Sequence, residues 1–244
     1  MFTIVKLDAT NSTNSYLKEW AKKADVSHGT VVLAKHQESG RGQLGAKWLS
    51  DNGKNLTFSI LYKFSNLQIT DQFYLNCAVS LAIYDALLPI IGKSLTVKWP
   101  NDIMSDDKKI GGILIENAVK NGYISQSVIG IGLNVNQIIF SDELPDATSL
   151  AIITQKTFDL DSVLDTILQS LEKKLKLLEL GQFADLNSAY QNTLYRRNIF
   201  SKFNEKNNNF LGKIIGVTIQ GKLQIQLESS ELREFSLKEV RFVF

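Results

Sequence analysis

The feature that most constrains the fold is an alternation of β-type and helical segments along the first two thirds of the chain. Apolar alternation and β-branched residues predict strands at about residues 2–7, 30–36, 55–62, 96–99, 109–116 and 125–134. Apolar residues at helical spacing predict helices after Ser12 and Thr13, from about Thr70 to Ile91, and from Asp161 to Leu180. With 44% apolar and 21% charged residues, disorder and a coiled-coil rod are excluded. We expect an α+β fold with a mixed β-sheet flanked by helices.

The character of the chain changes after about Leu194. A polar stretch at residues 201–209 precedes a predicted strand at 210–218, a Gln220-Gly221 turn, and apolar residues that alternate at 223, 225 and 227 and again at 240, 242 and 244. We therefore expect residues 1–194 to form the main domain and residues 195–244 to form a small all-β, barrel-like domain.

Charge and cysteine content exclude several classes of protein. The chain has 27 basic and 25 acidic residues, so its overall field is too weak for a dedicated nucleic-acid binder. One cysteine, Cys77, and two histidines are too few for a structural zinc site. Asp8 interrupts any secretory apolar segment, and no run of about 18 apolar residues suggests a membrane span. We expect a cytoplasmic protein that binds neither nucleic acid nor membranes.

A glycine-rich segment, GRGQLG at residues 40–45, formally matches a dinucleotide-binding fingerprint. The match fails in context, because residues 46–53 lead through an Asp-Asn-Gly turn into another strand instead of opening a helix. A Walker loop fails as well, since Gly45 is followed by Ala46. Glycines still let the backbone approach a ligand closely, and Arg41 and Lys47 add positive charge. The segment therefore suits a phosphate or adenylate cradle, the alternative being a flexible turn with solvated basic residues.

Three more strand ends carry glycine or lysine. In VKWPND, Lys98 lies between two apolar residues on a strand that Pro100 ends, where it either snorkels to solvent or meets an anion. In KIGGILIE a Gly-Gly pair inside a strand is costly unless another group passes close to the backbone. GIGLNV repeats the pattern and adds Asn134, whose amide can pair with a base edge or a loop carbonyl.

These motifs, taken in order, resemble those of the biotin protein ligases. They are STN at 12–14, Gln37 followed by GRGQLGAKW, KWPND at 98–102, KIGGILIE at 109–116, GIGLNV at 130–135 and ATSL at 147–150. The resemblance spans nearly the whole chain, although the C-terminal part matches in character only. It implies that biotin reacts with ATP to give biotinyl-5′-AMP and pyrophosphate, and that the biotinyl group then passes to a lysine of a biotin carboxyl carrier domain, as in acetyl-CoA carboxylase. Only eleven residues precede Ser12, so we expect the short type of ligase without a DNA-binding domain.

The resemblance also assigns roles to residues. Attack of a carboxylate on the α-phosphorus brings anions together, so the site needs fixed positive charge, and Arg41 and Lys98 are the expected catalytic cations. The implied biotin-binding residues are Ser12, Thr13, Asn14, Gln37, Gly40, Arg41, Gly42, Gln43, Lys98 and Gly112. The implied ATP and adenylate residues are Arg41, Gly42, Gly45, Trp48, Lys98, Lys109 and Asn134. Mg²⁺ is expected on the ATP phosphates, with no protein ligand assigned.

The sequence departs from the family pattern within the glycine-rich segment. Many members carry arginine where this chain has Gln43 and Ala46, so the adenylate is expected to be held less tightly or with the help of Lys47. The segments 38–48 and 136–148 are expected to close over the intermediate.

Several alternatives stay open at this stage. A lipoate ligase or octanoyl transferase shares the general fold, although Cys77, in an apolar helix, suits a buried thiol better than an acyl-enzyme. A non-catalytic binding module is the other rival. Asp102 is a candidate for deprotonating the acceptor lysine, with capping of its turn as the simpler role. The chain could be a monomer or a homodimer, and the sequence does not name the carrier.

Overall fold

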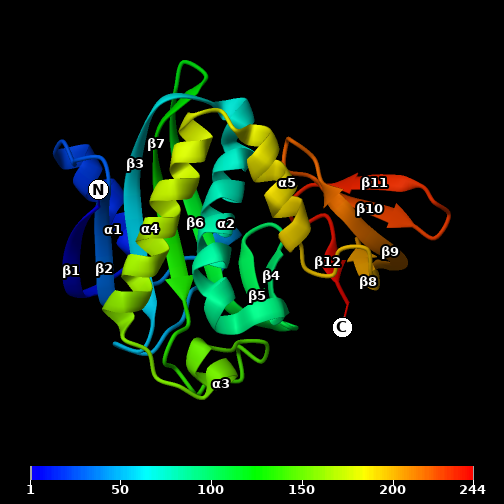
Figure 1. The fold of residues 1–244 in the computed structure, drawn as a ribbon, viewed down its shortest axis with the longest axis horizontal. Helices are drawn as coiled ribbons and strands as arrows, with labels where there is room; N and C mark the ends of the chain where they lie inside the picture. The colour runs from blue at the N-terminus through cyan, green and yellow to red at the C-terminus, as the bar shows by residue number, and fades with distance from the viewer. Residues whose placement is uncertain (1, 244) are drawn as a thin grey trace.

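The larger part of the protein is one mixed seven-stranded sheet (Figure 1). The computed structural model describes residues 2–243. Strands β1 and β2 are parallel and every other neighbouring pair is antiparallel, with the spatial order β1-β2-β3-β7-β6-β5-β4. The strands are β1 (Thr3–Thr10), β2 (Thr30–Gln37), β3 (Leu56–Gln68), β4 (Leu95–Lys98), β5 (Asp102–Ser105), β6 (Lys108–Lys120) and β7 (Tyr123–Leu133). The expected mixed sheet is confirmed.

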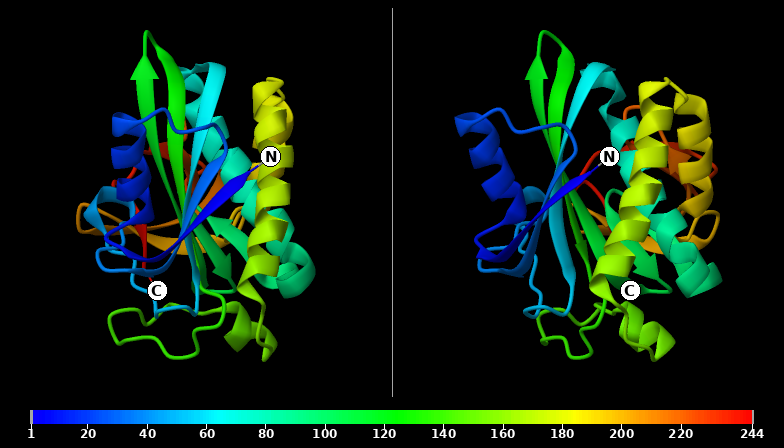
Figure 2. Two further views of the ribbon diagram at one scale, coloured as in Figure 1. Left: turned by 90° about the vertical axis from the view of Figure 1, so that its left-hand side faces the viewer. Right: turned by 60° about the vertical axis from the view of Figure 1, so that its left-hand side comes forward.

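Helices cover both faces of this sheet, as the two side views show (Figure 2). Helix α1 (Thr13–Lys23) lies on one face and begins where the Ser12 side chain accepts a hydrogen bond from the backbone of Ser15. The opposite face carries α2 (Gln72–Ile91) and α4 (Leu160–Glu179), while α5 (Phe183–Thr193) packs against α2. A short α3 (Leu150–Thr154) follows the long loop after β7. The three helices predicted from the sequence are present, within a few residues of their expected bounds.

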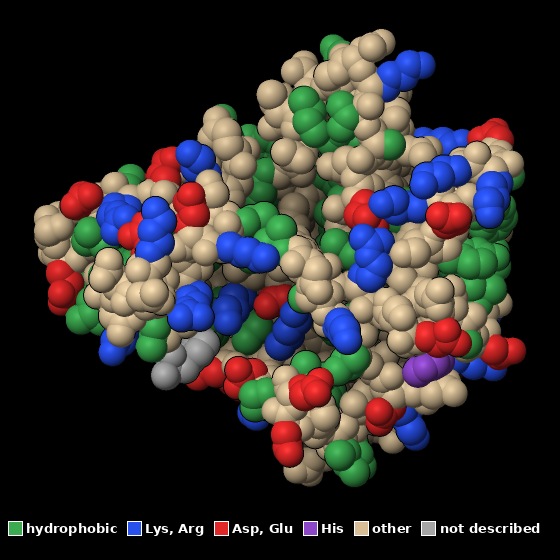
Figure 3. Space-filling model, turned by 180° about the vertical axis from the view of Figure 1, so that it is seen from behind, with side chains coloured by type: hydrophobic (Ala, Val, Ile, Leu, Met, Phe, Trp, Pro, Cys, Tyr) green, Lys and Arg blue, Asp and Glu red, His purple; other side chains and the backbone are tan. Residues whose placement is uncertain are grey.

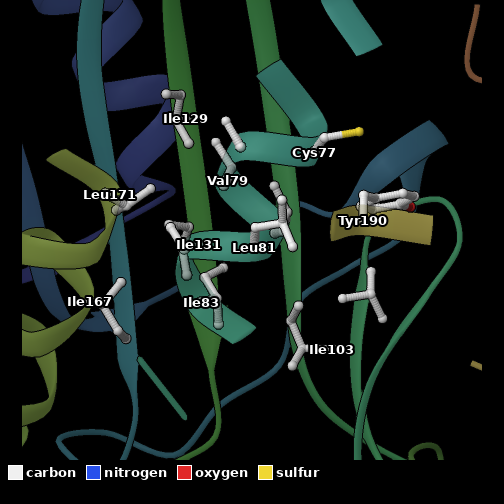
Figure 4. Close-up of a cluster of buried hydrophobic side chains, with 14 of the residues drawn as sticks. Cys77, Val79, Leu81, Ile83, Ile103, Ile129, Ile131, Ile167, Leu171 and Tyr190 are labelled. Atoms are coloured by element: carbon white, nitrogen blue, oxygen red, sulfur yellow. The ribbon is translucent and has the colours of Figure 1, made fainter. Parts of the chain in front are cut away.

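Helix α2 forms the centre of the core. Its side chains Val79 and Ile83 point toward β7 and α4, whereas Cys77 points the other way, toward Tyr190 on α5 (Figure 4). With its flanks, residues 69–94, it is long and apolar enough to cross a membrane by length and composition, contrary to the expectation from the sequence. Because 56% of the relevant window is buried inside the fold, we interpret it as a core helix.

The C-terminal part forms a second, antiparallel sheet of five strands, in the order β11-β10-β9-β8-β12. Its strands are β8 (Phe200–Glu205), β9 (Asn208–Val217), β10 (Leu223–Leu227), β11 (Leu232–Phe235) and β12 (Arg241–Phe242). The polar stretch at 201–209 is part of the β8–β9 hairpin, because Ser201 and Phe203 alternate inward. The last predicted strand is short, and Phe244 lies outside the described residues.

Other local predictions needed correction. Asp102 opens β5 instead of sitting in a turn, because it pairs with both Lys98 and Gly112 across the sheet. The turn lies just before it, at residues 99–101, where the Trp99–Pro100 peptide is cis. Helices α3 and α5 were not predicted, since neither has the long apolar repeat that marks α4.

The two sheets are joined by direct hydrogen bonds. The indole of Trp99 donates to the Gly221 carbonyl at 2.9 Å. The Gln191 amide on α5 donates to the carbonyl of Val217 at 2.7 Å and accepts from its backbone N–H at 3.0 Å. We propose that the domain boundary lies at residues 194 and 195, between α5 and β8.

Candidate active site

A cavity of about 220 Å³ opens on the α1 face of the large sheet. It is bounded by the start of α1, the end of β2, the glycine-rich loop, and the middle of β6 and β7. Its lining includes Ser12, Thr13, Asn14, Gln37, Arg41, Gly42, Gln43, Trp48, Lys109 and Gly112 among the residues singled out from the sequence. The structure therefore brings together most of the predicted site residues, although they come from four separate segments.

The glycines of β7 make room for this cavity. Ile129 and Ile131 point into the core beneath α2 (Figure 4), so the alternate positions 130 and 132 face the site. A Cβ at Gly130 would overlap the Asn14 amide, and a Cβ at Gly132 would overlap the Trp48 ring. A Cβ at Gly112 on β6 would lie 3.4 Å from both the Trp48 ring and the Lys109 ammonium. In the GIG pattern, each glycine therefore leaves room for one side chain of the site, while Ile131 between them packs in the core.

The N-terminus of α1 holds a set of buried polar groups. The Thr13 backbone N–H donates to Gln37 Oε1 at 2.8 Å, and the Thr13 hydroxyl donates to the same oxygen at 3.2 Å. The fully buried Ser59 hydroxyl donates to Asn14 Oδ1 at 2.6 Å and lies 2.7 Å from the Thr13 hydroxyl. Asn14 in turn donates to the Leu114 carbonyl at 3.2 Å. These bonds fix the polar side chains at this end of the cavity before any ligand arrives.

The glycine-rich loop is braced by its own backbone. Gly42 donates to the Ala46 carbonyl at 2.7 Å, and Trp48 donates to the Gly40 carbonyl at 2.9 Å. Leu44 and Gly45 adopt positive φ angles of 55° and 85°, which close a tight turn between them. The loop is a compact backbone ring that borders the cavity.

Arg41 joins this loop to the carboxylate of Glu116 on β6. Its guanidinium donates at 3.1 Å and 3.4 Å to the two carboxylate oxygens, and at 3.2 Å to the Ser15 hydroxyl. Glu116 also accepts from Lys18 at 2.7 Å and from Asn14 at 3.0 Å. Burial alone would raise the pKa of the Glu116 carboxyl, but the hydrogen bonds from Lys18 and Asn14 and the charge of Arg41 outweigh burial and lower its pKa.

Lys109 lines the cavity directly. Its ammonium pairs with the Asp102 carboxylate at 2.5 Å and lies 5.9 Å from the centre of the Trp48 ring. The backbone of Lys109 is bound on both sides by the loop after β7, donating to the Asp146 carbonyl and accepting from Thr148. These hydrogen bonds fix the backbone of Lys109 at the edge of the cavity.

Lys98 lies in a neighbouring cavity of about 310 Å³ between the two sheets, and does not line the first one. The two cavities adjoin, since both are bordered by Gln43, Asn101 and Asp102. The Lys98 ammonium lies 5.8 Å and 5.3 Å from the ring centres of Tyr195 and Phe242. Burial lowers the pKa of its ammonium group.

Asn134 and Gly45 also lie apart from the first cavity. Asn134 is buried and donates to the Thr148 carbonyl at 3.0 Å, which ties the end of β7 to the segment before α3. Its Oδ1 atom is buried without a hydrogen-bond partner among the described residues. Gly45, with Gly40, borders a third hollow on the outer side of the glycine-rich loop.

Positive charge gathers around both cavities. Lys47 and Lys109 border the first, and Lys98, Lys238 and Arg241 border the second. Figure 3 shows Lys and Arg side chains gathered where the surface is hollowed between the larger and the smaller part of the molecule. A hollow of this kind favours anionic ligands.

Sequence reasoning missed two residues that hold the site together. Ser59 lies in an apolar strand, and nothing in its neighbourhood marks it as a partner of Thr13 and Asn14. Glu116 ends the KIGGILIE motif, and an acidic residue closing an apolar run was a signal that could have been followed.

The fold and site define a class of protein. A mixed sheet carries a cavity with fixed polar groups at one end and a glycine-rich, cationic border at the other, and a second small sheet closes an adjoining cavity. This is the arrangement of a ligase that activates a small carboxylic acid and attaches it to another protein.

Comparisons with known proteins identify the family. The model of the biotin/lipoate A/B protein ligase family matches residues 7–134. The bifunctional ligase/repressor BirA of Bacillus spizizenii is 30% identical over 237 residues, covering 96% of this chain and 72% of that protein. The biotin–[acetyl-CoA-carboxylase] ligase of Mycobacterium tuberculosis is 32% identical over 68% of this chain and 61% of its own length. The chain belongs to the biotin/lipoate A/B protein ligase family.

Solved structures agree with this assignment. The biotin protein ligase from Aquifex aeolicus, solved in complex with biotin and ATP, superposes with a TM-score of 0.80 at 31% sequence identity. The match covers 98% of this chain and 98% of that one, so it includes the second sheet.

Proposed function

We propose that this protein is a biotin protein ligase that converts biotin and ATP to biotinyl-5′-AMP and pyrophosphate, and then transfers the biotinyl group to a lysine of a biotin carboxyl carrier domain. One observation supports this above the others. A single cavity has fixed amide and hydroxyl groups at the α1 end and Lys109 with the glycine-rich loop at the other. Such a cavity suits a ligand with a rigid polar head, an apolar body and a carboxylate tail.

The polar end of the cavity is assigned to the ureido ring. Thr13 and Gln37 are held by their mutual bonds, and Ser12 lies beside them at the helix start. Phe58 and Trp48 border the middle of the cavity, where the apolar body of biotin would lie. A site built on such hydrogen bonds rejects a ligand that lacks matching groups by about 10⁴-fold or more, since its buried partners would go unpaired.

The charged end of the cavity is assigned to the reaction. The carboxylate attacks the α-phosphorus, the bond to the leaving pyrophosphate breaks, and positive groups fixed in place lower the energy of the charge that develops. We assign Lys109 to the carboxylate side, and Lys98, in the adjoining cavity, to the phosphate side. Mg²⁺ arrives as the Mg-ATP substrate, and within residues 2–243 no group of three or more metal-ligating side chains lies close enough together to hold a further ion.

Transfer follows when the acceptor lysine attacks the mixed anhydride. Its amine forms a C–N bond to the acyl carbon, AMP leaves, and one proton is lost. Asp102 is the carboxylate beside Lys109 and is our candidate for receiving that proton. We assign the protein to the cytoplasm, where the carrier domain and a reduced Cys77 would be found.

An acceptor assay tests the proposal. Purified protein, Mg-ATP and a generic biotin carrier domain are incubated with biotin, lipoate or octanoate in parallel, and the carrier mass is measured. We expect a shift with biotin alone, and none without ATP. Modification by lipoate or octanoate would instead make the protein a lipoate-type ligase, and no shift with any acid would leave it as a binding module.

A further inference from the structure

The glycine-rich loop forms hydrogen bonds to the rest of the protein through the side chain of Arg41. Within residues 2–243, every side-chain hydrogen bond made by residues 40–47 comes from Arg41. The backbone bonds of residues 41–47 run within the loop or to its own flanks. What holds Arg41 therefore decides how firmly the loop lies over the site.

Arg41 is held chiefly by Glu116, a carboxylate whose side chain is only 18% exposed. Because both carboxylate oxygens accept from the guanidinium, the pair is bidentate, which fixes direction as well as distance. The other partner, the Ser15 hydroxyl, is neutral and lies at 3.2 Å.

Glu116 is itself held in place from helix α1. Lys18 and Asn14 donate to it at 2.7 Å and 3.0 Å, and Asn14 is pinned by Ser59 and by the space left at Gly130. The carboxylate thus connects the polar end of the cavity to the loop at its charged end.

We propose that Glu116 is a positioning residue that latches the glycine-rich loop through Arg41 and so sets how long the protein retains its acyl-adenylate. The proposal rests on the proposed function for the identity of the retained molecule, but the latch itself does not. Its importance is greater here because Gln43 and Ala46 stand where many family members carry arginine, and Gln43 makes no side-chain hydrogen bond among the described residues.

The latch is tested without any ligand by limited trypsin digestion, with the rate of cleavage at Lys47–Trp48 followed by mass spectrometry. We expect Glu116→Gln to raise this rate roughly tenfold, the factor that corresponds to losing about one charge-assisted bond. Glu38→Gln is the matched control, because Glu38 is an exposed neighbour of the loop whose side chain makes none of the bonds above. Lys18→Met removes one donor to the same carboxylate but keeps Asn14 and Arg41 on it, so it should raise the rate clearly less than Glu116→Gln does.

Arg41→Met supplies a second variant that removes the other half of the pair. It should raise cleavage as much as Glu116→Gln, and the double variant should add little, which is the signature of coupled residues. Unchanged cleavage in Glu116→Gln, or an equal rise in Lys18→Met, would overturn the latch.

The consequence for retention is measured on biotinyl-5′-AMP formed by the protein and chased with unlabelled biotin and ATP. Glu116→Gln should release it roughly tenfold faster than Glu38→Gln does, and equal release rates would overturn the role in retention. If the wild-type protein forms no biotinyl-5′-AMP, the proposed function fails, while the digestion result still decides whether Glu116 latches the loop.

Discussion

Two lysines share the positive charge of the site, and their surroundings differ. Lys109 is paired with Asp102 inside the cavity, whereas Lys98 is half-buried beside two aromatic rings in the adjoining one. An ammonium group fixed by a carboxylate keeps its position, so Lys109 is prepared for an anion before substrate binds. We therefore expect both lysines to act in adenylate formation, Lys109 at the carboxylate and Lys98 at the phosphate.

Replacement of Lys109 tests this division. Lys109→Met should lower biotin-dependent exchange of pyrophosphate into ATP by about 10²- to 10³-fold, as is usual for loss of one fixed donor at a developing charge. Lys108→Met, one residue earlier and exposed, is the control and should keep normal exchange. Lys98→Ala should stay folded and lose overall carrier modification. Near-normal exchange in either Lys109→Met or Lys98→Ala would remove that lysine from adenylate formation.

The sequence predicted which residues gather at the site better than it predicted their contacts. Motif order placed Thr13, Gln37, Lys109 and the glycines together, because each stands at a strand end or helix start whose position the fold determines. It did not place Lys98 in the second cavity, since that cavity is lined by residues of both parts of the molecule. Ser59 was missed for a related reason, as its partners are distant in sequence.

At the scale of elements, α2 shows how an apolar helix can be read in two ways. Its composition is that of a membrane-spanning helix, and only its burial between the large sheet and helices α4 and α5 identifies it as a core helix. The patterns of strands β6 and β7 were less ambiguous, since Gly-Gly and GIG already indicated that other groups approach these strands closely. Helix α5 was not predicted, because it has few apolar residues and its polar face binds the second sheet.

The thiol of Cys77 on α2 reports on this packing. It is fully buried, and burial raises its pKa, so the reactive thiolate is suppressed in the native state. We expect a maleimide reagent to modify it only as fast as the protein unfolds, with rapid modification in denaturant. Cys77→Ala should keep carrier modification. Fast labelling of the native protein, together with lost activity in that variant, would instead support an acyl-enzyme mechanism.

At the scale of the whole molecule, the second sheet completes the site. Strand β12 and the segment after α5 supply the rings beside Lys98, so the adjoining cavity exists only when the two parts are docked. The docking rests on specific groups, among them the Gln191 amide, which satisfies both backbone groups of Val217.

Gln191→Leu should therefore weaken the docking. It leaves a carbonyl and an N–H without their partner, at a cost of about 1–3 kcal/mol for each group that stays buried. We expect urea denaturation to show this loss, with the second sheet unfolding earlier than the first. Gln169→Leu, on the exposed side of α4, is the matched control and should change stability by less than about 0.5 kcal/mol. Equal stability of both variants would show that the Gln191 hydrogen bonds do not help to hold the two parts together.

The seating of Trp48 on Gly132 also constrains how this chain can change over time. Any side chain at position 132 would occupy the space that the indole fills. In evolution, Gly132 could be replaced by a larger residue only after Trp48 had been replaced by a smaller one. If Gly132 changed first, the Trp48 ring would have no space to occupy. The same holds for Asn14 and Gly130, so neighbouring glycines of one strand tie together the histories of two distant segments.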